Sequence, residues 1–432
     1  MKFTTEQVLA LAPDASSAKA GQGLANTRHW VTLGNNESAV WGECQGSGKN
    51  PYQTQVDLSD IACKCSCPSR KFPCKHGLGL LLLFANQTAP FKDSTPPQWV
   101  SEWLASRTKR AEQKAERVAK QAEEIADPTA QAKRTASREA KVAAGLRELE
   151  LWLHDLIRHG LATPNVQEHK FWDQPTKRMV DAQAPGLARL LQQAASHSAF
   201  GASGHERMLK QLAKIHLLIE GYKRIDSLPA ETQADLRTQI GWTQNQDELL
   251  KQSGVKDKWF VQGQRVTEED RLRVQATWLR GMATKRDALI LQYAHGSQAL
   301  ETNWFVNTVV EAELVFFPSA YPLRALVKEL CTMTSEPPSF AMTIAQAIAA
   351  YAAAIARQPW LERFPFALQS VVPFRREEQW FVRDAAQHIL PIAPSYSKGW
   401  ELLAMSGGHP VQLFGEWDGE FLLPLSVWTS SF

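Results

Sequence analysis

Cysteine clustering near the N-terminus constrains this chain more than any other feature of its sequence. Residues 63–76 read CKCSCPSRKFPCKH, and they hold four of the six cysteines in a chain of 432 residues. Cys65-x-Cys67 and Cys74-x-His76, six residues apart, offer three thiolates and one imidazole, which is a complete set for tetrahedral zinc. We therefore predict a zinc site formed by Cys65, Cys67, Cys74 and His76.

The rest of the sequence favours a metal site over a disulfide framework. The apolar run at residues 8–12 is too short for a secretory signal, and the run at residues 78–85 is too short to span a bilayer. We therefore expect a cytoplasmic protein that makes no membrane contact. Clustered cysteines in a reducing compartment more often bind a metal than form disulfides.

One alternative ligand remains open within the cluster. Cys63 could take the place of Cys65 or Cys67, because alternate residues of a strand share a face. Cys44 and Cys331 are expected to be ordinary thiols. Three thiolates and Zn²⁺ sum to −1, whereas four basic residues of the stretch add +4: Lys64, Arg70, Lys71 and Lys75.

An α+β fold is expected, beginning with a zinc-binding ββα module at residues 1–95. Strand-like alternation at residues 38–67 includes a Gly/Ser/Asn turn, and a leucine-rich segment that follows His76 predicts a helix. Near the N-terminus, Thr4 and Gln7 fit a capping box at the start of a short helix.

Two helical segments are predicted next. Residues 96–145 are rich in Ala, Lys, Arg, Glu and Gln, which indicates a charged linker helix that Pro128 breaks or kinks. Residues 146–254 form a helical region with two apolar stripes. The stripes are Leu146, Leu149, Leu153, Leu156 and Ile157, and then Met208, Leu212, Ile215, Ile219 and Tyr222.

Residues 255–432 are predicted to form a mixed α+β domain that is rich in antiparallel strands. Four strand-like segments cover residues 259–317, and an Ala-rich helix follows with Phe340, Ile344, Ile348, Tyr351 and Ile355 on one face. The C-terminus alternates as WELLAMS, VQLFGEW and EFLLPLSVW around Gly407-Gly408 and Asp418-Gly419, which favours an antiparallel meander.

At this point the sequence resembles a family. The pattern C-x-C-x(n)-C-x-H of residues 65–76 is that of the SWIM-type zinc finger, and residues 1–90 resemble the bacterial SWIM zinc finger family. The resembling segments are LAPDASSAKAGQGLA, WGECQGSGKNPYQTQVDL and KCSCPSRKFPCKHGLGLLLL. The resemblance implies a zinc-binding ββα module that serves DNA or protein interaction. It implies no enzyme, and it describes little of residues 146–432.

The function expected from these observations is a zinc-binding interaction protein with a protein partner. Trp380, Trp400, Trp417 and Trp428 crowd the C-terminal strands, and tryptophan is enriched at interaction surfaces. The alternative is a nucleic-acid-binding protein that uses the linker helix and the basic residues Lys64, Arg70, Lys71 and Lys75. No catalytic residues are predicted, since a zinc with four protein ligands lacks the open position that catalysis requires.

Overall fold

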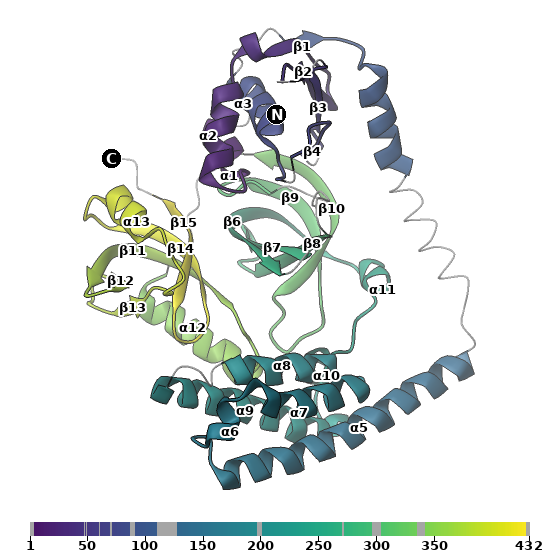
Figure 1. Cartoon of the computed structure of the whole chain (residues 1–432), viewed down its shortest axis with the longest axis vertical. Helices are drawn as coiled ribbons and strands as arrows, with labels where there is room; N and C mark the ends of the chain where they lie inside the picture. The colour runs from purple at the N-terminus through teal and green to yellow at the C-terminus, as the bar shows by residue number, and fades with distance from the viewer. Residues whose placement is uncertain are drawn as a thin grey trace.

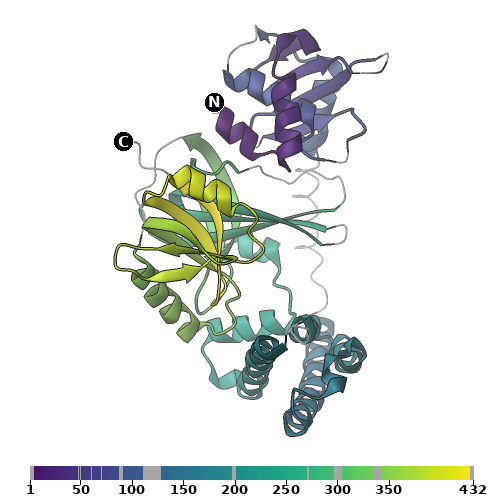
Figure 2. The same ribbon diagram turned by 60° about the vertical axis from the view of Figure 1, so that its left-hand side comes forward.

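The computed structural model has four parts arranged along the chain (Figure 1). It describes residues 4–428 apart from 47, 49, 60, 70, 87–90, 110–127, 197–200, 270–271, 296–303 and 335–341. An N-terminal α+β module lies at one end of the molecule and a helical bundle at the other, with a β-barrel between them and a C-terminal sheet beside the barrel (Figures 1 and 2). The order of a small β module, a helical region and a β-rich C-terminal region confirms the predicted α+β class.

The N-terminal module packs helices against one small sheet. The sheet has the order β4-β3-β2-β1-β5, in which only the β1–β5 pair is parallel among the described strands. Its elements are α1 (Thr5–Ala10), α2 (Ala15–Leu24), η1 (Thr27–His29), β1 (Trp30–Asn35), β2 (Ala39–Cys44), β3 (Tyr52–Asp57), β4 (Ala62–Cys65), α3 (Lys75–Asn86) and β5 (Lys92–Asp93). The predicted ββα unit is therefore embedded in a larger sheet, to which β1 and β5 add strands.

Local sequence signals explain two features of this module. Thr4 caps α1, and its side chain and that of Gln7 form the predicted capping box. Glycine lets α2 and α3 approach closely, because a Cβ added to Gly79 would lie 2.8 Å from the Cβ of Leu24. Gly79 therefore serves helix packing, although glycine weakens a helix by its own propensity.

The bundle follows, and a single long helix opens it. Its elements are α5 (Pro128–His159), α6 (Pro164–Gln167), α7 (His169–Asp181), α8 (Pro185–Ser196), α9 (Gly201–Lys223), η3 (Ile225–Ser227) and α10 (Ala230–Ile240). A short helix, α11 (Gln246–Leu250), follows the bundle and packs against the barrel (Figure 1). α5 crosses the predicted boundary at residues 145–146 without a break, because glycine at 145 is tolerated where the helix passes close to Ala182. The predicted linker helix is otherwise helical at residues 98–109, and its middle, residues 110–127, lies outside the described residues.

Both predicted stripes lie in the bundle core. All members of the first stripe are buried except Ile157, which is 50% exposed. This prediction was wrong for Ile157, which lies on the edge of the apolar face next to Leu156 and turns toward the surface. Met208, Leu212, Ile215 and Ile219 are all buried, and Tyr222 packs against the same cluster.

A closed barrel occupies the middle of the molecule. Its strand order is β10-β8-β7-β6-β9, built from β6 (Val255–Glu269), β7 (Leu272–Gly281), β8 (Asp287–His295), β9 (Val309–Phe316) and β10 (Arg324–Thr334). Four of these strands cover the segments predicted as strands. The fifth, β10, was not predicted, and it pairs with β9 and β8 to close the barrel.

The C-terminal sheet has the order β13-β12-β11-β14-β15 and packs against two helices. Its elements are α12 (Ile344–Arg357), β11 (Phe364–Arg376), β12 (Gln379–Arg383), β13 (Ile389–Pro391), α13 (Gly399–Ser406), β14 (Val411–Trp417) and β15 (Leu422–Trp428). The segment WELLAMS, predicted as a strand, is the helix α13. Gly407 adopts the left-handed conformation at φ +57° and ends this helix, so the Gly-Gly pair is a helix stop and not a hairpin turn.

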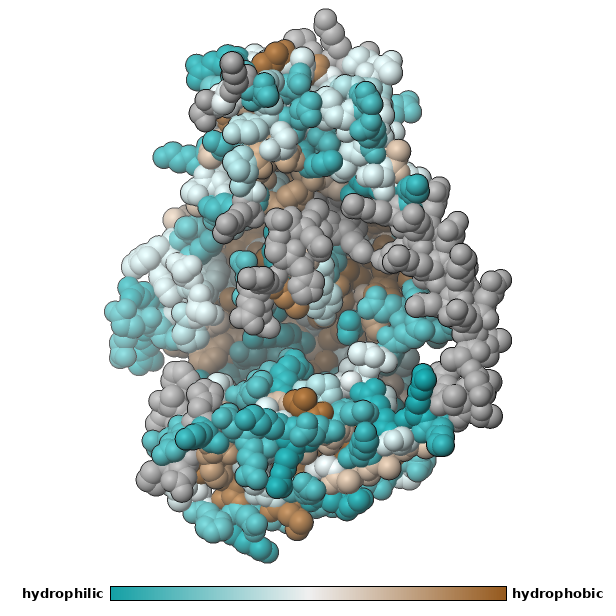
Figure 3. Space-filling view, turned by 45° about the vertical axis from the view of Figure 1, so that its right-hand side comes forward, coloured by the Kyte–Doolittle hydropathy of each residue, from teal (hydrophilic) through white to brown (hydrophobic). Residues whose placement is uncertain are grey.

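Buried polar contacts join the bundle to the β-rich half. Asp235 of α10 accepts hydrogen bonds from the backbone N–H of Ala320 (2.8 Å) and from the side chain of Gln358 (3.3 Å), and its burial raises the pKa of its carboxyl group. Trp360 packs into the bundle core and donates a hydrogen bond to the carbonyl of Lys214. The space-filling view shows a hollow above the bundle (Figure 3), and a cleft of about 540 Å³ with Asp235 and Trp360 in its lining lies where bundle, barrel and C-terminal sheet meet.

Candidate metal centre

β4 and α3 hold the four predicted ligands. Cys65 ends β4, Cys67 lies in the loop that follows, Cys74 directly precedes α3, and His76 lies in the first turn of α3. The pairing of β4 with β3 places Cys65 opposite Thr54, whose hydroxyl oxygen lies 3.2 Å from the Cys65 sulfur. A strand end and a helix start thus bring both halves of the C-x-C and C-x-H pattern to one point.

The geometry of the cluster fits a tetrahedral metal. All four ligating atoms lie within 4.8 Å of one another. The Nδ1 atom of His76 lies 3.6 Å from the Cys65 sulfur and 3.9 Å from the Cys74 sulfur. Tetrahedral zinc with its usual bond lengths separates a sulfur ligand from a nitrogen ligand by about 3.5 Å. The cluster is therefore suited to zinc with little rearrangement.

Burial shields one side of the cluster. Cys74 and His76 are buried, whereas Cys65 and Cys67 are partly accessible. The imidazole of His76 packs against the ring of Tyr52, with 4.9 Å between the ring centres. This contact fixes the orientation of the ring with Nδ1 toward the sulfur atoms, as a second layer of residues does in many zinc sites.

Without the charge of a metal ion, the thiols influence one another strongly. The hydrogen bond with Cys67 is the main cause that raises the pKa of Cys65, and the hydrogen bond with Cys65 is the main cause that lowers the pKa of Cys67. Burial opposes the charged form of His76, but hydrogen bonds with Cys67 and Cys74 raise its pKa to about 9. Three thiols and an imidazole that share protons at one point favour a divalent cation, which stabilises the thiolate form of every cysteine at once.

Cys63 and Cys44 stand outside this cluster. The sulfur of Cys63 lies 3.8 Å from the carbonyl oxygen of Ile61, and the side chain packs in the apolar core of the module. Cys44 is buried on β2, and burial raises the pKa of its thiol to about 11. The groups able to hold a metal among the described residues contain neither of them.

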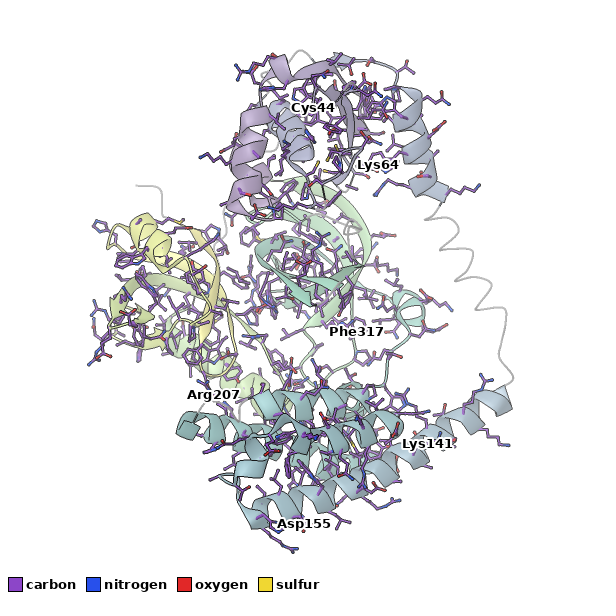
Figure 4. The ribbon with its side chains drawn as sticks, in the orientation of Figure 1. Cys44, Lys64, Lys141, Asp155, Arg207 and Phe317 are labelled. Atoms are coloured by element: carbon purple, nitrogen blue, oxygen red, sulfur yellow. The ribbon has the colours of Figure 1, made fainter. Side chains whose placement is uncertain are left out.

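The predicted basic residues surround the cluster at the surface. Lys64, Lys71 and Lys75 are exposed, and Arg70 lies outside the described residues. Lys71 forms an ion pair with Asp14 (2.8 Å), which lowers the pKa of that carboxyl group well below its ordinary value. Figure 4 labels Lys64, which lies near the cysteine sulfur atoms of the module.

A groove beside the cluster adds two residues that the sequence did not single out. It has a volume of about 380 Å³, and its lining includes Lys64, Lys71, Trp103 and Arg107. Trp103 and Arg107 are one helical turn apart, and the Arg107 guanidinium lies 5.5 Å from the centre of the Trp103 ring. Their i,i+4 spacing was visible in the sequence, but only the fold places this helix against the finger.

A ligand set closed by three cysteines and one histidine, held between a strand and a helix, defines a zinc finger domain. Comparison with protein families gives the particular type. Residues 52–84 match the SWIM zinc finger, and residues 137–240 match the SWIM-associated four-helix bundle domain. The chain therefore carries a SWIM zinc finger and the helix bundle associated with it.

The family matches account for the finger and the bundle, and the remaining comparisons add nothing to them. No curated protein and no solved structure matches the chain. In the part of the chain that the structure describes, no helix has both the length and the apolar character needed to cross a membrane.

Proposed function

We propose that this chain is a zinc-binding interaction protein that docks a protein partner on its C-terminal sheet, and that it is not an enzyme. The zinc finger then has a structural role, because all four ligand positions come from the protein. We also place this function in the cytoplasm, where cysteines stay reduced and available to zinc.

One surface carries this proposal. Trp400 of α13 is 63% exposed. The Trp400 ring meets the Trp380 ring edge to face, with 5.1 Å between their centres. We call Trp380, Trp400 and Arg375 the Trp400 surface. Large exposed apolar side chains of this kind are typical of protein interfaces.

The Trp400 surface is ordered before any partner binds. The Arg375 guanidinium lies 5.9 Å from the Trp380 ring centre and 5.4 Å from the Trp400 ring centre. Gly399 allows the Trp380 ring to press on the start of α13, since an added Cβ would lie 2.2 Å from that ring. Tryptophan and arginine dominate the energetics of protein interfaces, and an ordered anchor loses less entropy on binding.

The experiment compares capture of partners by wild type and by Trp400→Ala in lysate of the native organism. Tyr293→Ala is the matched control, because Tyr293 is an equally accessible aromatic residue on the barrel at 50% exposure. We expect a protein that wild type and Tyr293→Ala both retain, and that Trp400→Ala loses at least tenfold. Equal recovery by all three proteins would exclude the Trp400 surface as the docking site.

A second candidate function is nucleic-acid binding, and the groove beside the finger favours it. The groove combines Lys64, Lys71 and Arg107 with the aromatic face of Trp103, the residue types that bind phosphate and stack on bases. Ion pairs weaken the case, because Lys71 is paired with Asp14 and Arg107 with Asp57. We therefore rank this function second.

Salt dependence tests the second candidate. Labelled single-stranded and duplex DNA and RNA are titrated with the protein at several salt concentrations, and the logarithm of affinity is expected to fall linearly with that of salt. Lys64→Ala should lower the slope by about 1, whereas Lys177→Ala on the distant bundle should not change it. Undetectable binding at low salt, or equal slopes for the two variants, would remove this candidate.

A further inference from the structure

We propose that the helical bundle contains a second metal site, formed by Glu150 and His154 of α5 and His216 of α9, which takes a divalent transition metal. The finger is far from it, at the opposite end of the molecule (Figure 1). The site depends on neither function proposed above, and the observations that carry it are the residue types, the spacing and the distances.

Helix geometry brings the three side chains together. Glu150 and His154 are four residues apart on α5 and share one face of that helix. His216 comes from the neighbouring helix α9, and its ring centre lies 5.9 Å from that of His154. One ligating atom from each of the three residues lies within 4.8 Å of the other two. Asp155, labelled in Figure 4, marks this part of α5 at the outer end of the bundle.

The scaffold beneath these residues is rigid. Leu149 and Leu153 flank the two α5 ligands in sequence, and Ile215 precedes His216; all three are buried in the core of the bundle. The helices therefore cannot rotate without exposing apolar side chains. Ligands on two packed helices are already placed for binding, and side-chain torsions alone must change to bring them to one ion.

The donor set selects the kind of metal. Two imidazoles and one carboxylate suit Zn²⁺, Ni²⁺ or Cu²⁺, whereas Ca²⁺ and Mg²⁺ prefer oxygen ligands only. Ligands on one zinc ion lie about 3.3 Å apart, so each side chain needs to move inward by a small distance. Three protein ligands leave at least one coordination position for water, which makes this site weaker than the four-ligand site of the finger.

A lysine now neutralises the carboxylate that the metal would bind. The Lys223 ammonium lies 2.5 Å from the Glu150 carboxylate and 2.7 Å from that of Glu220. Glu220 is four residues from His216 on α9, and its pKa is lowered mainly by the hydrogen bond with Lys223. When a metal binds Glu150, Lys223 retains Glu220 as its partner. Lys223 is therefore a competitor of the metal.

The experiment titrates Zn²⁺ into untagged full-length protein whose finger is already loaded, and heat and bound metal are measured. Wild type is expected to take up a second equivalent of zinc. His154→Ala and His216→Ala should each weaken this second event at least tenfold and keep the first zinc. His159→Ala is the matched control, because His159 is an exposed histidine of the same helix outside the cluster, and it should bind as wild type does.

Lys223→Gln provides a test that adventitious binding to surface histidines would not satisfy. It is expected to tighten the second event by up to about fivefold, the size of an exposed ion pair. Circular dichroism confirms that each variant is folded. The proposal is overturned if wild type binds a single equivalent, if the His154 and His216 variants bind like wild type, or if His159→Ala weakens binding as much as they do.

Discussion

The finger module and the β-rich half of the molecule are stabilised by different kinds of interaction. In the finger, the described residues of the loop between β4 and α3 contain no helix or strand, and the four candidate metal ligands lie at its two ends. In the β-rich half, the barrel and the C-terminal sheet share apolar cores and a buried polar network around Glu416. The difference teaches that one chain can rely on a metal in one region and on side-chain burial in another.

The largest expected effect is loss of the metal from the finger. Cys74→Ser should remove the zinc, because structural zinc contributes on the order of 10 kcal/mol in isolated fingers and needs all its ligands. Amide exchange should then rise across residues 52–84, while the bundle keeps its protection. Metal analysis and hydrogen exchange by mass spectrometry measure both effects.

Cys63→Ala is the control for this change, since Cys63 lies outside the ligand cluster. It should keep one zinc per chain. Full zinc content in Cys74→Ser, or zinc loss in Cys63→Ala, would contradict the ligand set. If amide exchange rises equally in all regions of Cys74→Ser, the finger module and the β-rich half are not stabilised independently.

The next effect is expected at Glu416, which is 1% exposed. Its carboxylate accepts hydrogen bonds from Arg265 (2.8 Å) and from the indole N–H of Trp278 (2.9 Å). Glu416→Ala leaves both donors without this acceptor and should lower the free energy of unfolding of the β-rich half by about 3 kcal/mol. Urea unfolding followed by tryptophan fluorescence measures the change.

Glu378→Ala is the matched control, because Glu378 also pairs with an arginine, Arg375, but is 93% exposed. Its removal should cost less than about 0.5 kcal/mol. A cost as small for Glu416→Ala would show that the buried network does not hold the barrel and the C-terminal sheet together.

A smaller effect is expected for Glu313 of the barrel, whose carboxylate should contribute less to the free energy of unfolding in acid. The Glu313 carboxylate accepts a hydrogen bond from the backbone N–H of Gly254 (2.8 Å) and pairs with Lys328 and Lys256. These contacts, the Gly254 bond first, lower the pKa of Glu313 from 4.5 to about 2. A lowered pKa means that this carboxylate stabilises the fold above about pH 4.5, and that the contribution is lost as pH falls toward 2.

The comparison of wild type with Glu313→Gln isolates this contribution. The urea midpoint of wild type should exceed that of the variant at pH 6, and the gap should narrow at pH 3. If the difference in urea midpoint is the same at pH 6 and pH 3, the stabilisation comes from the packing of the Glu313 side chain and not from its charge.

The smallest effect is expected at the surface of the finger module. Asp14 and Lys71 form an exposed ion pair, and Asp14 also caps α2 by accepting the N–H of Ser17 (2.7 Å). Lys71→Ala removes the ion pair and a long, exposed hydrogen bond to Ser16 (3.4 Å), keeps the cap, and should cost less than about 0.5 kcal/mol. Asp14→Ala removes the cap as well and should cost about 1 kcal/mol. Protection of α2 amides against exchange distinguishes them, and equal costs would show that the cap contributes nothing.

The finger could be predicted from sequence because its ligands are close along the chain. Cys65 and His76 are separated by ten residues, so the spacing itself carries the chemistry. The bundle site could not be found in this way, because His216 lies more than sixty residues beyond His154 and only helix packing brings them together. The same reason hid Trp103 and Arg107 beside the finger.

Two errors in the β-rich half have local physical causes. The face of α12 was assigned by its largest side chains, but Ala347 and Ala354 are buried while Ile348 is 37% exposed. Small residues let this helix lie close to the sheet. Which face of the helix is buried therefore depends on the shape of the sheet surface and not on hydrophobicity alone. The strand β10 was missed because no alternating pattern was recognised in residues 324–334, and barrel closure supplies its pairing.

Only the three-dimensional structure shows which C-terminal tryptophans lie in the core and which lie at the surface. Trp417 is buried and stacks on Phe366, with 5.4 Å between the ring centres, whereas Trp400 is exposed. Both occur in the same C-terminal stretch with similar neighbours. Trp380 and Trp428 are partly buried and pack against the core of the C-terminal sheet. The predicted crowding of aromatic residues therefore contained packing residues as well as one exposed candidate anchor, and the sequence offered no way to distinguish them.

Phe305 gives the molecule one further property. This residue of the connection that precedes β9 belongs to the apolar core of the finger module, where it is buried together with Val8, Trp30 and Leu78. A fragment ending at residue 95 would therefore lack a piece of its own interior. Folding of the finger module is therefore expected to finish only after a segment more than two hundred residues further along the chain has joined its core.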